Sequence, residues 1–189
     1  MSNGEPMRLA APLTPEAISL LRAGDRVLLG GVIYTARDAA HRRLCELLAA
    51  NRPFPVDLRA QVIYYVGPTP APPRHVIGAA GPTTASRMDP YTPALLEYGI
   101  GAMIGKGMRS SAVVEAIVRH RSTYLAAIAG AGALMSTCIQ DANIAAFEDL
   151  GPEAIFRLTV RNMPLIVIND CLGGDLYRSA PREWQRRGT

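Results

Sequence analysis

Alternation of apolar and polar residues is the strongest regular signal along the chain, and it predicts β-strands. Residues 155–160 (IFRLTV) follow the period of two that a half-buried strand requires, and residues 26–35 (RVLLGGVIYT) are a further strand candidate. Shorter runs are apolar throughout, which is typical of strands buried on both faces. The Gly30–Gly31 pair predicts either a bulge in the first strand or a close approach of another backbone to it. The predicted strands are 26–35, 61–66, 102–104, 123–129, 155–160 and 165–170, with a turn at 162–164 between the last two.

Helix signals lie between these strands. Thr14 followed by Pro15 is an N-cap with proline at the first helical position, and Gly99 is a residue type that ends helices. Asp38 is the predicted cap of a helix whose apolar positions recur at helical spacing, and Ser110 or Ser111 caps another. The predicted helices run over 15–21, from 38 onward, over 92–98, from 111 onward and over 134–144.

The order of these elements predicts a mixed α/β fold. A length of 189 residues, of which 49% are hydrophobic, fits one domain that spans residues 1–189 with a sizeable core. Residues 1–13 and 178–189 lack a clear period, so we expect an irregular arm and an irregular tail there.

The bulk composition limits the classes of function. No apolar run approaches the roughly 20 residues that span a bilayer, and the first residues do not read as a secretory signal, so we expect a cytoplasmic protein without membrane contact. The net charge of +4 is spread along the chain, with one cluster at Arg182, Arg186 and Arg187, and aromatic residues make up 6%. This pattern does not favour nucleic acid, and a basic pocket for a small anion suits it better.

The three cysteines do not predict a metal site. Cys45, Cys138 and Cys171 are far apart, odd in number and without a CxxC partner, so neither a disulfide framework nor a local zinc site is indicated. We therefore expect no metal to be bound by this chain alone.

Candidate chemistry concentrates in residues 81–111. Thr83, Thr84 and Arg87 follow a Gly-Pro turn, and Lys106, the only lysine of the chain, stands between two glycines. Lysine offers a compact point charge where arginine offers a planar fork, so this choice indicates a position that guanidinium cannot serve, although an exposed loop cation would look the same. Upstream, Arg37 lies at a predicted strand-to-helix junction, where it either binds an anion or pairs with a surface carboxylate.

Other common sites do not fit. A P-loop would require glycine at position 100 and Ser or Thr at position 107, which are Ile100 and Gly107. The chain has no G-x-S-x-G motif, which argues against a Ser–His–Asp hydrolase. What remains is a set of hydroxyls and cations at strand ends and helix starts, without an electrophile, which suits a small dicarboxylate and reads as half of an active site. Its members are Arg37, Thr83, Thr84, Arg87, Lys106 and Arg109.

Four blocks of sequence resemble a known family. They are YTARDAAH (34–41), GPTTASRMDPY (81–91), GKGMRS (105–110) and EDLGPEAIFRLTV (148–160). In this order they resemble the β subunit, or C-terminal domain, of the iron–sulfur hydro-lyases, namely class I fumarate hydratase and L(+)-tartrate dehydratase. The resemblance covers roughly residues 15–177.

The resemblance implies a swivelling β/β/α domain, a mixed sheet with flanking helices. It also implies a partner α subunit that carries a [4Fe–4S] cluster, hence a hetero-oligomer, with a dimer of this chain alone left open. The implied reaction is reversible hydration of a C4 dicarboxylate, with fumarate and malate as the first expectation and tartrate dehydration as the alternative. A non-catalytic small-anion-binding module of the same fold is the alternative from another class.

Residue by residue, the resemblance implies the following roles. Thr83 and Lys106 would be catalytic, with Thr83 moving a proton once a carboxylate of the partner activates it. Arg37, Arg87 and Thr84 would bind the substrate, and the two arginines together with Lys106 would hold its carboxylates. Because Arg87 lies four residues after Thr83, one helical turn would place both on one side.

Overall fold

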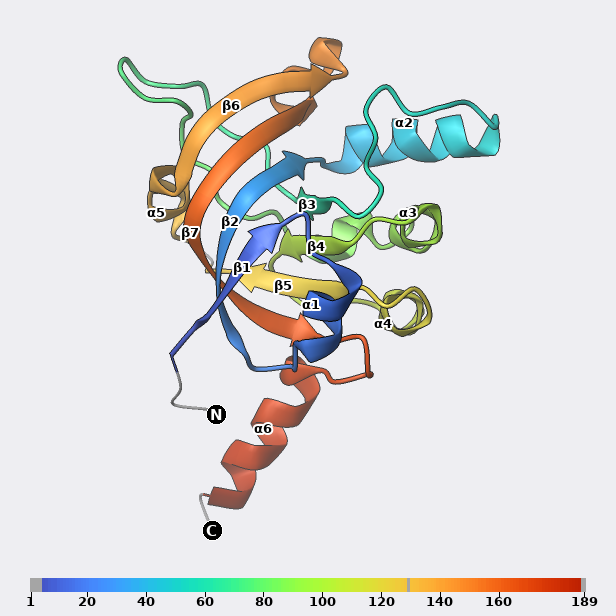
Figure 1. The fold of residues 1–189 in the computed structure, drawn as a ribbon, viewed down its shortest axis with the longest axis vertical. Coiled ribbons are helices and arrows are strands. Elements are labelled where there is room, and N and C mark those ends of the chain that lie inside the picture. The colour runs from blue at the N-terminus through green and yellow to red at the C-terminus, as the bar shows by residue number, and fades with distance from the viewer. Residues whose placement is uncertain (1–4, 129, 188–189) are drawn as a thin grey trace.

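A computed structural model describes residues 5–128 and 130–187. Its strands form one mixed sheet in the order β1-β2-β3-β4-β5-β7-β6, with helices packed around it, which confirms the mixed α/β prediction (Figure 1). The strands are β1 (Met7–Ala11), β2 (Arg26–Thr35), β3 (Val62–Tyr64), β4 (Ala102–Gly105), β5 (Thr123–Ala127), β6 (Ile139–Ala146) and β7 (Ile155–Asn169). The helices are α1 (Pro15–Leu20), α2 (Asp38–Ala49), α3 (Thr92–Tyr98), α4 (Ser111–Arg119), α5 (Gly132–Thr137) and α6 (Leu176–Arg187), with short 3-10 helices at Ala85–Met88 and Glu148–Glu153.

The sheet closes on itself. Strands β2, β3, β4 and β5 are parallel neighbours, and β7 runs antiparallel to β5 on one side and to β2 on the other. β2, β3, β4, β5 and β7 therefore form a closed ring, in which β7 connects β5 back to β2. β1 pairs in parallel with the first half of β2, and β6 extends the sheet along β7.

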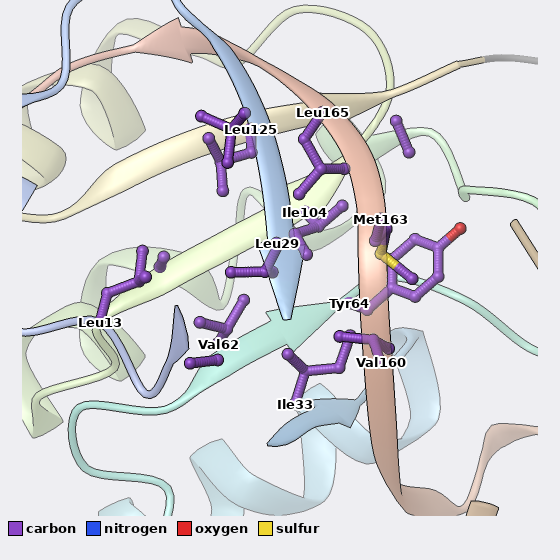
Figure 2. Packing of buried hydrophobic residues seen from close by; sticks show 14 of the residues in the cluster. Leu13, Leu29, Ile33, Val62, Tyr64, Ile104, Leu125, Val160, Met163 and Leu165 are labelled. Atoms are coloured by element: carbon purple, nitrogen blue, oxygen red, sulfur yellow. The ribbon is translucent and has the colours of Figure 1, made fainter. Parts of the chain in front are cut away.

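The interior of this ring is apolar. Figure 2 shows side chains from β2, β3, β4, β5 and β7 pointing toward one another, among them Leu29, Val62 and Ile104. Ile18 of α1 and Leu21 belong to the same buried cluster, so this short helix covers one end of the ring. Tyr64 also points inward, and its hydroxyl donates a hydrogen bond to the Ala80 carbonyl, which satisfies its polar atom.

A second apolar layer lies outside the ring. Alternate residues of the same strands, Ile63, Met103 and Tyr124, pack against buried positions of α2, α3 and α4. Figure 1 shows these three helices together on one side of the sheet. Because β3 and β4 are covered on both faces, every residue in them is buried, which explains why their sequences are apolar throughout.

Several local predictions are confirmed. Thr14 caps α1 by accepting a hydrogen bond from the Ala17 amide at 3.2 Å. β2 has the predicted bounds, with a register shift between Leu29 and Gly31. Gly99 ends α3 with a φ of 115°, and Ser110 occupies the N-cap position of α4.

Other predictions are wrong. Residues 7–11 of the expected arm form β1, because β2 offers an open edge for parallel pairing, and residues 176–187 form α6 where a tail was expected. The predicted 134–144 helix ends at Thr137, and residues 139–146 form an edge strand on β7. The predicted turn at 162–164 is absent, since β7 is one strand with a bulge at Asn162, whose φ is 51°.

The described residues contain no helix that is both long enough and apolar enough to span a bilayer.

Candidate functional site

The candidate residues lie where the parallel strands end. Because β2, β3 and β4 run in the same direction, their carboxyl ends share one edge of the sheet, the usual place for a ligand in such folds. Arg37 follows β2, Gly67 follows β3 and Lys106 follows β4. The segment that carries Thr83 and Thr84 runs along the same edge, since the Thr83 amide donates to the Tyr65 carbonyl at 2.7 Å.

Thr83, Thr84 and Lys106 are joined through their backbones. The Lys106 amide donates to the Thr83 carbonyl at 3.2 Å, and the Lys106 carbonyl accepts from Ala85 at 2.8 Å. Thr84 and Lys106 thus form a parallel bridge that extends β4 by one residue. The main chain fixes these residues without using the threonine hydroxyls or the lysine ammonium, so those groups are available for chemistry.

Glycines make this close approach possible. A Cβ on Gly105 would lie 2.9 Å from the Tyr65 ring and 3.1 Å from the Ala85 side chain. Gly107 has a φ of 82°, a left-handed conformation that other residues rarely adopt. The Lys106 backbone is therefore held between two positions that only glycine fills well, while its half-buried side chain makes no ion pair within the described residues.

Arg37 occupies a slot between two loops. Its Nη2 lies 3.4 Å from Oε1 of Glu153, and its Nε lies 3.9 Å from Oδ2 of Asp38. The guanidinium rests on the bare backbone of Gly67, where a Cβ would lie only 2.4 Å from Nη1. Nε is buried and has no hydrogen-bond partner in the described structure, so Arg37 pairs with a carboxylate and still has an unsatisfied donor.

Arg87 reaches the same junction from the 3-10 helix. Its Nε donates to Oδ1 of Asp38 at 2.9 Å, and Nη2 lies 2.9 Å from Oδ2 as an ion pair outside hydrogen-bond geometry. Asp38 is the first helical residue of α2, with Arg37 at the N-cap, so the predicted cap role of Asp38 is wrong. Its carboxylate faces both arginines.

Two further expectations about the site are wrong. Thr83 and Arg87 do not share a helical turn, because the 3-10 helix begins at Ala85, after the extended residue Thr84. Arg109 is not available to an anion, since it is buried and donates to Asp89 and Thr92, each at 2.7 Å. Tyr65 accepts a third hydrogen bond from it at 3.3 Å, so Arg109 supports the layer beneath the site.

The sequence reasoning missed Glu153 and Gly67. Glu153 accepts a hydrogen bond from the Ala39 amide at 2.9 Å, which ties the 148–153 segment to the first turn of α2 beside Arg37. The available signal was the block EDLGPE, which belonged to the family resemblance but to which no role was assigned.

The site is distinct from a hollow of about 510 Å³ near the other end of α2, lined by Arg52, Phe54, Arg59 and Tyr98 among others.

His41 is buried one helical turn after Arg37. Its Nδ1 lies 2.9 Å from the Arg37 carbonyl, and its ring meets Tyr65 edge-on at 5.2 Å. The carbonyl can only accept, so Nδ1 carries the proton in this contact. Burial lowers the pKa of His41 to about 4, with a smaller contribution from Arg109, while the Arg37 carbonyl and Asp38 oppose the shift.

This lowered pKa predicts acid sensitivity of the fold. The unfolded histidine takes up a proton below about pH 6.5, whereas the folded one stays neutral until about pH 4. The contribution is therefore complete above pH 6.5 and is lost as pH falls toward 4, amounting to roughly 3 kcal/mol of unfolding free energy. Urea unfolding measured from pH 7 to pH 4 checks this. His41→Asn keeps a donor near the Arg37 carbonyl but cannot titrate, so an unchanged pH slope in that variant would contradict the assignment.

The chain's own residues do not fit an iron–sulfur cluster. The described part of the chain holds no group of three His, Cys, Asp or Glu side chains placed to bind a metal ion. Cys45 contacts the Tyr91 carbonyl from α2, Cys138 follows α5, and Cys171 contacts the Ile18 carbonyl. The three thiols therefore belong to separate parts of the fold.

Sequence comparison relates this chain to a protein family and to several named proteins. The family model described as Fumarase C-terminus matches residues 2–180. Fumarate hydratase 2 of Leishmania major is 35% identical over 165 residues, which is 86% of this chain and 29% of that protein. The anaerobic class I fumarate hydratase of Escherichia coli is 37% identical over 164 residues, which is 85% of this chain and 30% of that protein.

One relative matches this chain over nearly its whole length. A Methanocaldococcus jannaschii protein named for the β subunit of L(+)-tartrate dehydratase is 34% identical over 177 residues, which is 90% of this chain and 91% of that protein. The chain thus spans under a third of the two fumarate hydratases and nearly all of this relative. With the family model matching most of its length, the chain belongs to the Fumarase C-terminus family.

Proposed function

We propose that this chain is the substrate-binding part of a hydro-lyase that adds water reversibly to a C4 dicarboxylate, fumarate and malate first. The observation that carries the proposal is the gathering of Thr83, Lys106, Arg37 and Arg87 at one edge of the sheet, in a member of this family. Two relatives named fumarate hydratase support the choice of substrate.

Charge complementarity supports a dicarboxylate. The site brings together three cations, Arg37, Arg87 and Lys106, against the carboxylates of Asp38 and Glu153. In the proposed complex each arginine binds a carboxylate of the substrate, and the positive charges stabilise the negative charge that builds up as a proton leaves the adjoining carbon.

Thr83 moves that proton in the proposed mechanism. A threonine hydroxyl is a weak base, so the mechanism needs a carboxylate to activate it, and we assign this carboxylate to the partner. The main chain of Thr83 is fixed by Tyr65 and Lys106, which leaves its hydroxyl free to turn toward the substrate. Thr84 contributes a second hydroxyl at the same edge, and its methyl group lies on the side of Gly107.

The partner in this proposal is an α subunit that carries a [4Fe–4S] cluster, and the assembled enzyme is a hetero-oligomer. The match over 91% of a relative named as a β subunit supports this arrangement. The same match favours L(+)-tartrate as the second candidate substrate.

Reconstitution tests the function. The chain is purified alone and with its α subunit under anaerobic conditions, and both are assayed with fumarate, malate, L(+)-tartrate and methylated fumarates. We expect activity only in the pair. Full-rate hydration by the lone chain would contradict the shared site. A pair that turns over none of these compounds, although the chain binds them, would identify a small-anion-binding module without catalysis.

Gly67→Ala tests the slot that holds Arg37. The new Cβ would displace the Arg37 side chain and would lie 3.2 Å from the Pro152 carbonyl, so we expect a small loss of stability and a rise of about tenfold in KM of the pair. Steady-state kinetics and thermal unfolding measure the two effects. Gly30→Ala is the matched control, since its Cβ would meet nothing closer than the Val160 carbonyl at 3.7 Å. An unchanged KM in Gly67→Ala would remove Arg37 from the binding site.

A further inference from the structure

Asp38 stands out as a carboxylate inside a site built to attract carboxylates. It occupies the first helical position of α2 and contacts the two arginines that the proposed function assigns to the substrate. A carboxylate at that place would compete with an anionic ligand unless it contacts the arginines on a side that the ligand does not use.

The contact with Arg87 has this property. Asp38 engages Arg87 through Nε and Nη2, one lateral edge of the guanidinium. A guanidinium carries five N–H donors in a rigid plane. Nη1 of Arg87 makes no hydrogen bond or ion pair with any residue that the structure describes, and the side chain is 50% exposed. The outer edge of the guanidinium is therefore open to a second carboxylate.

The carboxylate of Asp38 is itself fixed. Asp38 lies in the first turn of a helix, where the unpaired amides favour negative charge. The same turn is held by Glu153, which accepts from the Ala39 amide at 2.9 Å. The side chain of Asp38 is only 31% exposed, so the ion pair with Arg87 is better shielded than a fully solvated one.

From this geometry we infer that Asp38 is a positioning residue for Arg87, which holds the guanidinium plane so that its outer edge faces a carboxylate of the substrate. This inference rests on the proposed function and adds a residue that acts through Arg87. Without Asp38, the long side chain of Arg87 has no other ion-pair partner among the described residues and loses its fixed orientation.

The test compares Asp38→Asn with Asp149→Asn in the reconstituted pair. Asp149 forms the same kind of ion pair with Arg43, further along α2, where both side chains are exposed and neither contacts Arg37 or Arg87, so it is the matched control. We expect Asp38→Asn to lower kcat/KM by about 10- to 100-fold, mainly through KM, since misplacing a binding group by about 1 Å can cost this much. Asp149→Asn keeps the wild-type values. An unchanged KM in Asp38→Asn overturns the inference.

A double-mutant cycle separates positioning from damage to the fold. If Asp38 acts through Arg87, Asp38→Asn lowers kcat/KM by less than about threefold when Arg87 is already alanine. If the fold-losses in kcat/KM of the two single variants multiply to give the loss of the double variant, the two residues act independently and the inference is overturned. Asp38→Ser, which also removes the charge but leaves a smaller side chain at the first helical position, gives the same kinetic result even where asparagine disturbs folding.

A second readout does not depend on turnover. The Nε–H resonance of Arg87 is observed by NMR in the chain, with and without fumarate, and assigned with Arg87→Lys. We expect a slowly exchanging signal that disappears in Asp38→Asn, together with weaker fumarate binding. If the pair proves inactive, the proposed function fails, and this measurement still decides the role of Asp38. Equal fumarate affinity in the wild type and Asp38→Asn overturns it.

Discussion

Replacing Lys106 with alanine is expected to lower kcat/KM of the reconstituted enzyme by about 30- to 4,000-fold, equivalent to roughly 2–5 kcal/mol for removing one partner of a desolvated charge pair. Lys106 is half-buried and makes no ion pair within the described chain, so its charge is not neutralised before a dianion arrives. The fold should not suffer, because Lys106 is held by backbone hydrogen bonds to Thr83 and Ala85 that alanine retains.

Two controls sharpen this expectation. Lys106→Arg restores the charge but not the shape, and we expect most of the loss to remain, because a planar fork cannot occupy the place of a compact ammonium. Arg119→Ala removes an exposed cation from α4 and should leave the rate unchanged. Steady-state kinetics and thermal unfolding are measured on all three. Wild-type kcat/KM in Lys106→Ala would remove this residue from the site.

Replacing Arg109 with alanine is expected to destabilise the chain by about 3–5 kcal/mol, because removing one partner of a buried ion pair leaves the other charge uncompensated. The side chain of Arg109 is fully buried and donates to Asp89, Thr92 and Tyr65. Its guanidinium also lies 5.0 Å from the centre of the Tyr124 ring, so a cation–π contact is lost as well. A fall in Tm of roughly 10 °C follows for a protein of this size.

Arg43→Ala is the matched comparison for Arg109→Ala. Arg43 also pairs with an aspartate, Asp149, but both side chains are exposed to solvent, where such pairs contribute little to stability. Urea unfolding of both variants gives the two free energies. Equal losses in the two variants would show that the burial of Arg109 does not govern its contribution.

The sequence predicts those elements whose identity is local. β2 was predicted with its bounds, and its register shift against β7 falls at the Gly30–Gly31 pair that the sequence singled out. β6 was not, because the sequence IQDANIAA is largely exposed and its strand conformation comes from pairing with β7, which no local period reveals. β7 was divided in two because Pro164 suggested a turn, whereas the bulge at Asn162 keeps the strand continuous.

The site residues also divide into those that local sequence predicts and those that only the fold reveals. Arg37, Thr83, Arg87 and Lys106 stood out because each follows a strand or a turn, and the resemblance gave them roles. Arg109 looked equivalent to them, since a linear pattern does not distinguish a buried guanidinium from an exposed one. Its partners Asp89 and Thr92 lie far enough along the chain that only the fold joins them. Glu153 stayed hidden for the same reason.

The closure of the sheet by β7 has a consequence for biosynthesis. The ring is completed only when residues around Arg26 pair with residues around Ile166, near the other end of the chain. Pairings between such distant segments form slowly, because closing the long loop lowers the chain entropy before the stabilising contacts have formed. During translation, β2 to β5 leave the ribosome before β7 exists, with the apolar interior of the ring uncovered. The nascent chain is therefore expected to need protection by chaperones until its last strand is made.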